Sequence, residues 1–536
     1  MANGINTTGS PGNPSLKGLP ALPADSGAPR FARLAKNAMA NMMRLGASWL
    51  VILIVPPILV RYLSHSEYST WMLVIEITAY STIFNSSMQA SVSRFVARAF
   101  WAEDWAMLGE TLSSITLLFV GAAVVVLGLI ALVALEMGRF FHAIPGGLLG
   151  EAKWALIIVG GSLALVFPTI SMAGLSLGIE KNKINAIAGA ASKLVGAAGT
   201  IWAALHHDGL VRMALWTSIG IFIQPAIFWI ATVRQGLWSF FSARLVRMHR
   251  AWEFCRFCAA ALASQIGSIL ISGLDVPIVA AWDFSNTGYY AIAAMVSNML
   301  AVPYSAVLST LIPLLSSRTA SESPETMGRM VIRTMRIANA LLLWIAVPLM
   351  IGMPLLLRLW VGKEYAAHTL VLGEILAASV LIRISVLPYG ITGFSAGEQN
   401  KMLVSPGVEA IVNVTLSIIL VHHIGALGVA VGTLVGTFVG IALHFWNSMA
   451  YTKSMSFRKT EFLVRGMLAP LGWAMPAAII SATLFFLTSS TGLKILVLAG
   501  CTAALPLIFW KVILGDEDRS LLRLATGHLF PRLSRV

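Results

Sequence analysis

The sequence predicts an all-α polytopic membrane protein with about 14 transmembrane helices. Its 536 residues are 57% hydrophobic and only 11% charged, and their mean hydropathy is +0.81, which excludes a soluble globular protein. Apolar runs of about 20 residues, long enough to cross the hydrocarbon core as helices, recur between short polar links. The runs lack the inside-outside alternation of membrane strands, so helices fit them better than a barrel does.

The expected helices form two repeated groups and a final pair. The first six spans cover 40–61, 68–90, 111–134, 154–176, 184–205 and 211–233. The next six cover 257–282, 288–316, 337–358, 367–391, 402–421 and 424–448, and the last two cover 466–488 and 493–513. We therefore expect two parallel six-helix bundles followed by two C-terminal helices.

The corresponding domain boundaries include two tails and a basic linker. The tail before the first bundle is rich in Gly, Pro, Ser and Asn, so we expect it to be disordered. The expected parts are a cytoplasmic tail at 1–36, a first bundle at 37–235, a linker at 236–256, a second bundle at 257–450, two extra helices at 451–515 and a cytoplasmic tail at 516–536.

Lysine and arginine set the expected orientation, because they are retained on the cytoplasmic side. With the amino terminus inside, cytoplasmic segments hold about 27 of the 37 basic residues, outer loops hold about 7, and about 3 lie within spans. An even number of spans then places both termini in the cytoplasm. The net charge of +14 fits a cationic inner face against anionic lipid and requires no nucleic acid. No cleavable signal peptide is expected.

One short pattern occurs twice. G-x-S-x-G, the spacing of a nucleophile elbow in some hydrolases, is present in GLSLG at 174–178 and in GFSAG at 393–397. Each copy precedes an Asn-Lys pair, at 182–183 and at 400–401. Both copies fall at the cytoplasmic end of an expected span, whereas an elbow needs a preceding strand and a soluble sheet. We therefore interpret them as an internal repeat and not as two nucleophiles.

The offset between the copies is 219 residues (393 minus 174), and it recurs elsewhere. Arg139 after the third span corresponds to Arg358 after the ninth. Pro168 lies one residue from the position equivalent to Pro388. Six spans are thus followed by six similar ones. Because six is even, both halves enter the membrane from the same side, as in transporters built from two parallel bundles.

The six plus six plus two spans, the serine-containing turns after spans four and ten, and the entries YSTW at 68–71 and GYY at 288–290 resemble a known family. This is the polysaccharide-transporter branch of the multidrug/oligosaccharidyl-lipid/polysaccharide exporter superfamily, with the O-antigen flippases. The resemblance covers about residues 36–515. It implies a MATE-like fold, with two helical bundles in a V around a cavity that opens alternately to each side.

The resemblance also implies a location, a substrate and partners. The location is the bacterial inner (cytoplasmic) membrane. The substrate is an undecaprenyl-pyrophosphate-linked oligosaccharide, moved from the cytoplasmic to the outer leaflet for the synthesis of a surface polysaccharide such as lipopolysaccharide O-antigen or exopolysaccharide. The implied partners are membrane lipids, a polysaccharide polymerase and a chain-length regulator. No cofactor is expected, and the chain has no Walker-type nucleotide motif.

Three basic residues lie within expected spans: Lys193, Arg44 and Arg383. A lipid-linked sugar has a head that cannot cross hydrocarbon, so a flippase needs a polar, preferably cationic interior. A charge at the centre of a membrane helix costs about 2.5 to 3.5 kcal/mol, so such charges usually face a cavity or a partner. We expect these three to bind the anionic head of the substrate. The alternatives are a structural ion pair for Lys193 and snorkelling for the two arginines.

Acidic residues within spans are candidates for ion coupling or for ion pairs: Asp275, Glu76 and Glu409. Asp275 precedes Pro277 by two residues, a spacing at which a helix tends to break. It could bind a proton or a sodium ion, pair with a basic residue across the cavity, or cap the broken helix. No catalytic or metal site is expected, because the C-x-x-C of Cys255 and Cys258 has no second pair.

Three other functions compete with the flippase. A multidrug exporter of the same superfamily resembles a twelve-span chain with an early acidic residue, whereas the first span here carries Arg44 and no acid. An integral-membrane polysaccharide polymerase or ligase would need a large outer loop, and the longest one here is the short link at 136–153. A non-transporting assembly subunit would have little use for intramembrane charges. The sequence therefore favours a flippase without enzymatic activity.

Overall fold

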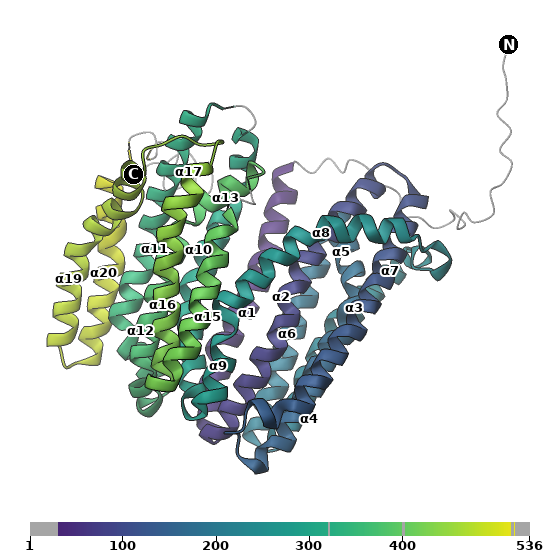
Figure 1. The fold of residues 1–536 in the computed structure, drawn as a ribbon, viewed down its shortest axis with the longest axis horizontal. Helices are drawn as coiled ribbons and strands as arrows, with labels where there is room; N and C mark the ends of the chain where they lie inside the picture. Colours follow the sequence, from purple (N-terminus) through teal and green to yellow (C-terminus); the bar gives the residue numbers. More distant parts are fainter. Residues whose placement is uncertain (1–29, 320–321, 399–401, 516–518, 520–536) are drawn as a thin grey trace. The chain divides into compact units, whose positions relative to one another are not determined.

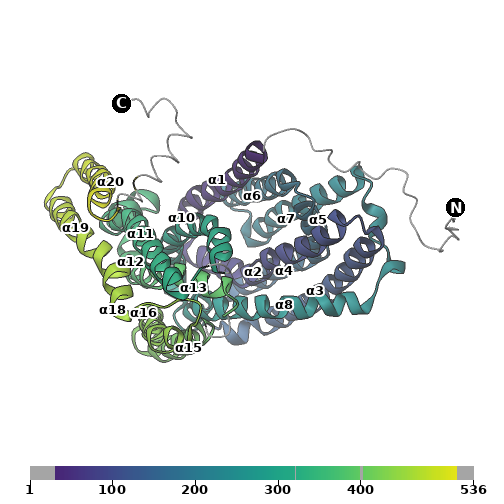
Figure 2. The ribbon, with the colours of Figure 1, turned by 90° about the horizontal axis from the view of Figure 1, so that it is seen from above.

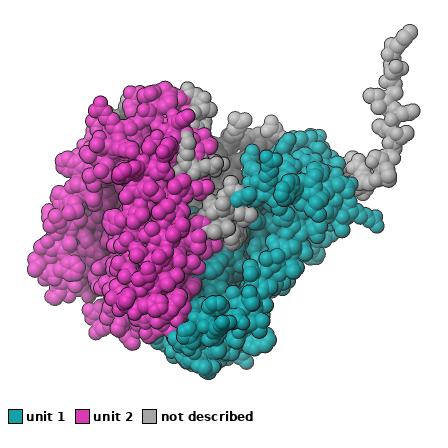
Figure 3. Space-filling model, in the orientation of Figure 1, with its two compact units in different colours: residues 1–266 teal, residues 267–536 magenta. Residues whose placement is uncertain are grey.

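The computed structural model of the protein describes residues 30–319, 322–398, 402–515 and 519. These residues form helices joined by short connections, and no strand occurs among them. The chain divides into two compact units, unit 1 at 1–266 and unit 2 at 267–536 (Figure 3). The all-α prediction is confirmed.

The helices of unit 1 follow one another with few intervening residues (Figure 1). In chain order they are α1 (Arg30–Tyr62), α2 (His65–Trp101), α3 (Trp105–Phe140), α4 (Gly146–Val166), the 3-10 turn η1 (Phe167–Thr169), α5 (Ile170–Gly178), α6 (Asn182–Leu205), α7 (Gly209–Arg234), the short turns η2 (Trp238–Phe240) and η3 (Ala243–Leu245), and α8 (Met248–Ser268).

Unit 2 contains the remaining helices and three π-helical turns. In chain order they are the π turn η4 (Ile269–Gly273), α9 (Asp275–Trp282), η5 (Phe284–Asn286), α10 (Thr287–Thr319), α11 (Pro324–Trp360), α12 (Lys363–Ser385), α13 (Leu387–Ser395), α15 (Val404–Ile424), α16 (Ala426–Leu443), the π turn η6 (His444–Ser448), α17 (Met449–Tyr451), α18 (Lys459–Glu461), the π turn η7 (Phe462–Leu468), α19 (Ala469–Leu487) and α20 (Thr491–Val512).

Eleven described helical segments are long and apolar enough to cross a membrane. The count of about 14 spans stays a prediction. The three further spans were expected in α2, in α8 with α9, and in α10, which are helical but are not among the eleven. The eleven apolar helical segments support the prediction of a polytopic membrane protein.

Helix breaks recur at matching places in the two units. In unit 1, the run from 146 to 178 is interrupted at Phe167–Thr169, beside Pro168. In unit 2, the run from 363 to 395 is interrupted between α12 and α13, beside Pro388. Proline removes a backbone donor and crowds the preceding turn, so it weakens a helix at that point. The proline correspondence found in the sequence is thus a shared helix break.

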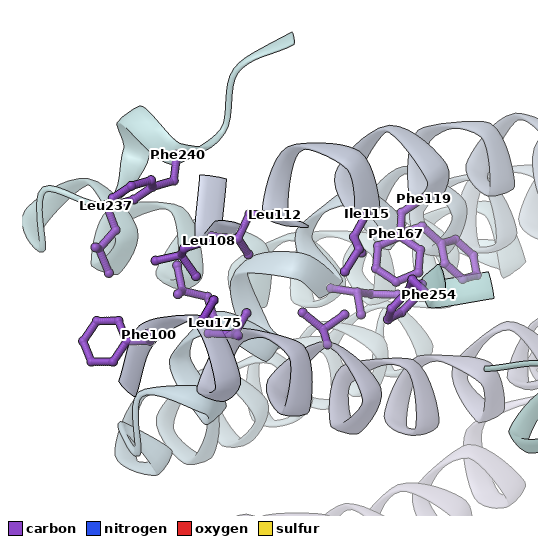
Figure 4. Packing of buried hydrophobic residues seen from close by; sticks show 14 of the residues in the cluster. Phe100, Leu108, Leu112, Ile115, Phe119, Phe167, Leu175, Leu237, Phe240 and Phe254 are labelled. Carbon is purple, nitrogen blue, oxygen red and sulfur yellow. The ribbon is translucent and has the colours of Figure 1, made fainter. Parts of the chain in front are cut away.

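The core of unit 1 gathers side chains from α2, α3, α5, α8 and the segment between α7 and α8 (Figure 4). Phe119 and Phe254 meet edge to face, with ring centroids 5.9 Å apart. Leu237 and Phe240, from the connecting segment, are fully buried in the same cluster. The segment between α7 and α8 is therefore packed into unit 1 as part of its core.

In unit 2, α19 and α20 pack against each other and against α11 (Figure 2). Trp344 on α11 donates its indole N–H to the carbonyl of Thr502 on α20 at 2.8 Å. Gly352 on α11 faces Leu498 so closely that an added Cβ would lie 2.8 Å from its side chain. The last two helices are thus a tightly attached part of unit 2.

Candidate functional site

Lys193 lies on α6 of unit 1 and is exposed. Its ammonium donates a hydrogen bond to the Ser48 hydroxyl of α1 at 2.6 Å, and α1 packs along α6. Small residues surround this part of α6. Gly196 approaches α7 so closely that a Cβ added to Gly220 would lie 2.5 Å from the Gly196 Cα. The structure therefore places Lys193 where α6 meets both α1 and α7.

The other two candidates in unit 1 lie on α1 and α2. Arg44 is helical and precedes Ser48 by four residues, which is one helical turn. Its side chain lies outside the described residues. Glu76 lies on α2 and is half-buried.

In unit 2, three helices meet around an ion pair. Arg383 on α12 donates from Nε to Glu409 Oε1 on α15 at 2.7 Å. Arg383 Nη2 donates to the Thr437 hydroxyl on α16 at 2.9 Å, and that hydroxyl donates to Glu409 Oε1 at 3.1 Å. The Glu409 side chain is 7% exposed and that of Arg383 is 23% exposed. The structure thus brings two of the predicted residues together as a largely buried, hydrogen-bonded pair.

The third guanidinium nitrogen of Arg383, Nη1, differs from the other two in its hydrogen bonding. Nη1 makes no hydrogen bond to a described residue, while Nε and Nη2 are both used within unit 2. Two of the five guanidinium N–H groups therefore hold the side chain in place. The remaining edge keeps donors for a bound anion or for water.

A second polar group surrounds Asp275, one helical turn after Glu409 on α15 and one turn before Thr437 on α16. Tyr290 and Thr433 each place a hydroxyl 3.0 Å from Asp275 Oδ2. Thr433 also lies 3.2 Å from Asn413 Oδ1, and it can donate its single proton to only one of its acceptors at a time. All four side chains are at least nine-tenths buried. A chain of exchangeable hydrogen bonds therefore links α9, α10, α15 and α16.

Asp275 stands at a break in its helix, as the Asp-x-Pro spacing predicts. The π turn η4 ends at Gly273, Leu274 forms a bend, and Asp275 begins α9. The Asn413 amide donates to the Ile271 carbonyl within the π turn. Asp275 makes no ion pair with a described residue. Its carboxylate instead accepts from hydroxyl groups, and a neutral amide satisfies a carbonyl of the broken helix.

A row of glycines explains how the polar groups of α15 and α16 come so close. Gly428, Gly432, Gly436 and Gly440 recur every four residues and therefore lie on one face of α16. A Cβ added to Gly432 would lie 2.6 Å from the Ser417 hydroxyl. One added to Gly440 would lie 2.7 Å from Glu409 Oε2. Small residues let membrane helices pack backbone to backbone, and here they place Glu409 and Asn413 directly against α16.

The two G-x-S-x-G copies lie at helix ends. Ser176 is buried near the end of α5, and Ser395 is the last residue of α13. In both places a main-chain N–H bonds to the carbonyl five residues earlier, Lys181 to Ser176 at 2.8 Å and Glu398 to Gly393 at 2.9 Å. These are Schellman-type helix ends, and neither serine has the strand-to-helix turn of a nucleophile elbow.

The glycines of the first copy have a packing role. A Cβ added to Gly174 would lie 2.5 Å from Val92 on α2, and one added to Gly178 would lie 2.8 Å from the Ser93 carbonyl. In the second copy, Gly397 adopts a left-handed φ of 79°, which costs glycine little. The repeated glycines therefore serve close helix packing and chain reversal.

Known structures share this arrangement of helices. The lipid II flippase MurJ, in its inward closed conformation, matches with a TM-score of 0.67 over 89% of this chain and 99% of its own, at 14% identity. An inward-facing multidrug-resistance MATE transporter of the MOP superfamily matches with a TM-score of 0.62 over 76% of this chain and 97% of its own, at 13% identity.

A mutant MATE transporter from Vibrio cholerae matches with a TM-score of 0.53 over 77% of this chain and 94% of its own, at 12% identity. The chain has the MATE-like fold. No family model and no curated protein matches the sequence. The fold expected from the resemblance is therefore confirmed by shape, while the O-antigen branch is not singled out.

Within the MATE-like fold, unit 2 holds the larger described polar cluster. Sequence reasoning found its charged members but missed four uncharged ones: Tyr290, Asn413, Thr433 and Thr437. One signal was available. Asn413 follows Glu409 by four residues, and Thr437 follows Thr433 by four, so each pair lies on one helix face. No group of three or more His, Cys, Asp or Glu side chains in the described ranges could hold a metal ion.

Proposed function

We propose that the protein is a flippase that moves a lipid-linked oligosaccharide from the cytoplasmic to the outer leaflet of a bacterial inner membrane by alternating access. The proposed cargo is the undecaprenyl-pyrophosphate-linked unit of a surface polysaccharide, such as O-antigen or exopolysaccharide. A polysaccharide polymerase and a chain-length regulator would then act on the translocated unit. Both termini are proposed to be cytoplasmic, on the distribution of Lys and Arg.

One observation carries the proposal: the match to the lipid II flippase MurJ over 89% of this chain. The MATE multidrug structures cover 76 to 78% of this chain and leave more of it unmatched. Their match also leaves the multidrug exporter as the rival function. A pair of additional helices, α19 and α20, is present here and packs on α11.

The proposed roles of the charged residues follow the needs of an anionic, sugar-bearing cargo. Lys193, Arg44 and Arg383 are proposed to contact the pyrophosphate or acidic sugars. Lys193 is exposed on α6, and Arg383 keeps its Nη1 edge for a further acceptor. Arginine and lysine are the usual side chains that bind phosphate oxygens, so these positions suit the proposed cargo.

Asp275, Glu76 and Glu409 are proposed as ion-coupling or ion-pair residues. Glu409 pairs with Arg383 at 2.7 Å, which supports the ion-pair role. The hydroxyl-lined carboxylate of Asp275 supports proton or cation coupling, because hydroxyl and amide groups can reorient when the carboxylate changes its charge. Neither role requires a bound cofactor.

Genetic complementation tests the proposal. The gene is deleted, and the lipid-linked oligosaccharide of the inner leaflet and the surface polysaccharide are both measured after wild type, Lys193→Ala, or the double mutant Ser176→Ala/Ser395→Ala is added back at equal expression. We expect the deletion to accumulate the lipid-linked unit and to lose the surface polymer. Wild type and the serine double mutant should restore the polymer, and Lys193→Ala should restore it poorly.

Two outcomes would contradict the flippase. If the lipid-linked unit reaches the outer leaflet normally but stays unpolymerised, the protein acts after translocation, as a polymerase or ligase would. If polysaccharide is unaffected and cells instead become sensitive to organic cations, the multidrug exporter is the correct function.

A further inference from the structure

The segment from Arg234 to Arg256, between α7 and the body of α8, has an unusual surface. It contains five arginines and one glutamate. Its exposed side chains include large apolar ones as well as cations. Met248 and Trp252 are each 71% exposed, and Trp238 is 44% exposed. We call the outward side chains of this segment the linker face; they are Arg234, Trp238, Arg244, Met248, Trp252 and Arg256.

The start of α8 is amphipathic, but both of its faces carry apolar groups. Ala251, Phe254 and Cys258 are no more than 6% exposed and belong to the side that packs on unit 1. Met248 and Trp252 are four residues apart, so they share the opposite side of the helix. A side that met only water would not be expected to present a tryptophan and a methionine side by side.

Two serines of α3 hydrogen-bond to the main chain of the segment and fix its position along α3. The Ser113 hydroxyl donates to the Phe240 carbonyl at 2.7 Å and accepts from the Ser242 N–H at 3.0 Å. The Ser114 hydroxyl accepts from the Arg247 N–H at 2.8 Å. Both serines lie about two turns inside α3, a helix apolar enough to span a membrane. The segment is therefore fixed near one end of a spanning helix, where lipid headgroups lie.

Glu110 on α3 adds an electrostatic attachment. Its two carboxylate oxygens lie 3.4 Å from Arg247 Nε and 3.6 Å from Arg250 Nε. The other three arginines of the segment are not used in this way. The side chains of Arg234, Arg244 and Arg256 are exposed and make no hydrogen bond or ion pair with a described residue. Arg247 and Arg250 thus attach the segment to α3, and Arg234, Arg244 and Arg256 add exposed positive charge that no described carboxylate pairs with.

The linker face continues an apolar surface of α7. Trp229, Phe222 and Ile230 are more than 40% exposed on this expected spanning helix. The Trp229 ring meets the Trp238 ring edge to face, with centroids 6.4 Å apart. Tryptophan side chains favour the boundary between hydrocarbon and headgroups. Trp238 therefore extends the side of α7 suited to lipid toward the arginines of the segment.

We propose that the linker face binds the headgroups of anionic phospholipids in the cytoplasmic leaflet. Trp238, Met248 and Trp252 would enter the interfacial layer, and Arg234, Arg244 and Arg256 would contact phosphate groups. This combination of exposed apolar and cationic side chains is the one by which interfacial helices bind anionic membranes. The proposal goes beyond the transport function, because it assigns a lipid site that is independent of the cargo.

The test measures lipid selectivity of the full-length protein in reconstituted vesicles. Spin-labelled phosphatidylglycerol and spin-labelled phosphatidylcholine are compared for the fraction that the protein immobilises. The test variant is Arg234→Gln/Arg244→Gln/Arg256→Gln. The matched control is Arg61→Gln/Arg139→Gln/Lys363→Gln. It also removes three positive charges, but from exposed positions that are expected on the outer side.

We expect wild type and the control to prefer phosphatidylglycerol over phosphatidylcholine. In the linker variant this preference should fall by about fivefold or more, since one arginine near an anionic surface contributes a factor of about five. A wild type with no preference would overturn the proposal. So would a linker variant that retains its preference or a control that loses it equally.

Salt gives a second test that needs no substitution. Between about 0.01 and 1 M salt the Debye length falls from about 30 to 3 Å, so the preference of wild type should largely disappear. A preference that survives at high salt would show that the arginines do not cause it. Trp252→Ser should lower immobilisation of both lipids while keeping the preference for phosphatidylglycerol; an unchanged immobilisation of both would overturn the apolar part of the proposal.

Discussion

The ion pair between Arg383 and Glu409 allows a quantitative prediction by a double-mutant cycle. In the structure Glu409 Oε1 accepts from Arg383 Nε at 2.7 Å and from the Thr437 hydroxyl at 3.1 Å. Arg383→Gln would leave a carboxylate that is 7% exposed with a single neutral donor. Glu409→Gln would leave the guanidinium, 23% exposed, beside an uncharged amide.

The expected magnitudes follow from the burial of each partner. Removing one member of a buried pair costs about 3 to 5 kcal/mol, and we expect Arg383→Gln to be the more harmful because Glu409 is the more deeply buried partner. Removing both charges together leaves a neutral, hydrogen-bonding pair. The double variant should therefore be at least about 2 kcal/mol more stable than the sum of the two single changes predicts.

Unfolding by SDS in mixed micelles measures these free energies for wild type, both single variants and the double variant. Thr437→Val is the control, because it removes one hydroxyl without changing the charge and should cost about 1 to 2 kcal/mol. If the losses in unfolding free energy of the two single variants add up to the loss of the double variant, the two side chains do not stabilise each other, which would contradict the ion pair. An Arg383→Gln variant as stable as wild type would show that Glu409 is not held by that guanidinium.

Three further predictions concern packing and helix ends. Gly432→Ala should lower the free energy of unfolding by about 1 to 3 kcal/mol, because its Cβ would lie 2.6 Å from a serine hydroxyl of α15, whereas Gly472→Ala, in open space, should change the same SDS-unfolding measurement little. Ser176→Ala should support surface polysaccharide synthesis in the complementation assay. Gly174→Ala should not, because its added Cβ would clash with a valine of α2. The reverse result would favour a catalytic role for the serine. Asp283→Ala should cost about 1 kcal/mol in thermal or SDS unfolding, since its carboxylate accepts the first N–H of α16 at 2.8 Å, and an unchanged stability would exclude that cap.

The fold class followed from the sequence because the membrane imposes a simple rule. Every main-chain group inside the hydrocarbon needs a partner within the protein, so long apolar runs become helices. The internal repeat also had a structural counterpart, since Pro168 and Pro388 both mark helix breaks. The break before Asp275 was predicted for the same reason, from a proline two residues later.

The partners of the charged residues were not predictable from spacing alone. Glu409 meets Arg383 only because α12, α15 and α16 pack together, and the sequence does not state which helices are neighbours. Thr433 and Thr437 are uncharged residues in an apolar helix. Their four-residue spacing puts them on one helix face, but it does not indicate that Asp275 and Glu409 lie against that face.

The measurement that tests the central claim most directly is translocation itself. Purified full-length protein is reconstituted into vesicles that contain a labelled lipid-linked oligosaccharide, and a membrane-impermeant reagent outside the vesicles reports how much of the sugar is exposed. We predict that wild type exposes the sugar of the inner leaflet with time, while protein-free vesicles do not, and that Lys193→Ala is slower at equal reconstitution. Exposure at the rate of protein-free vesicles, in protein that is folded, would contradict the flippase.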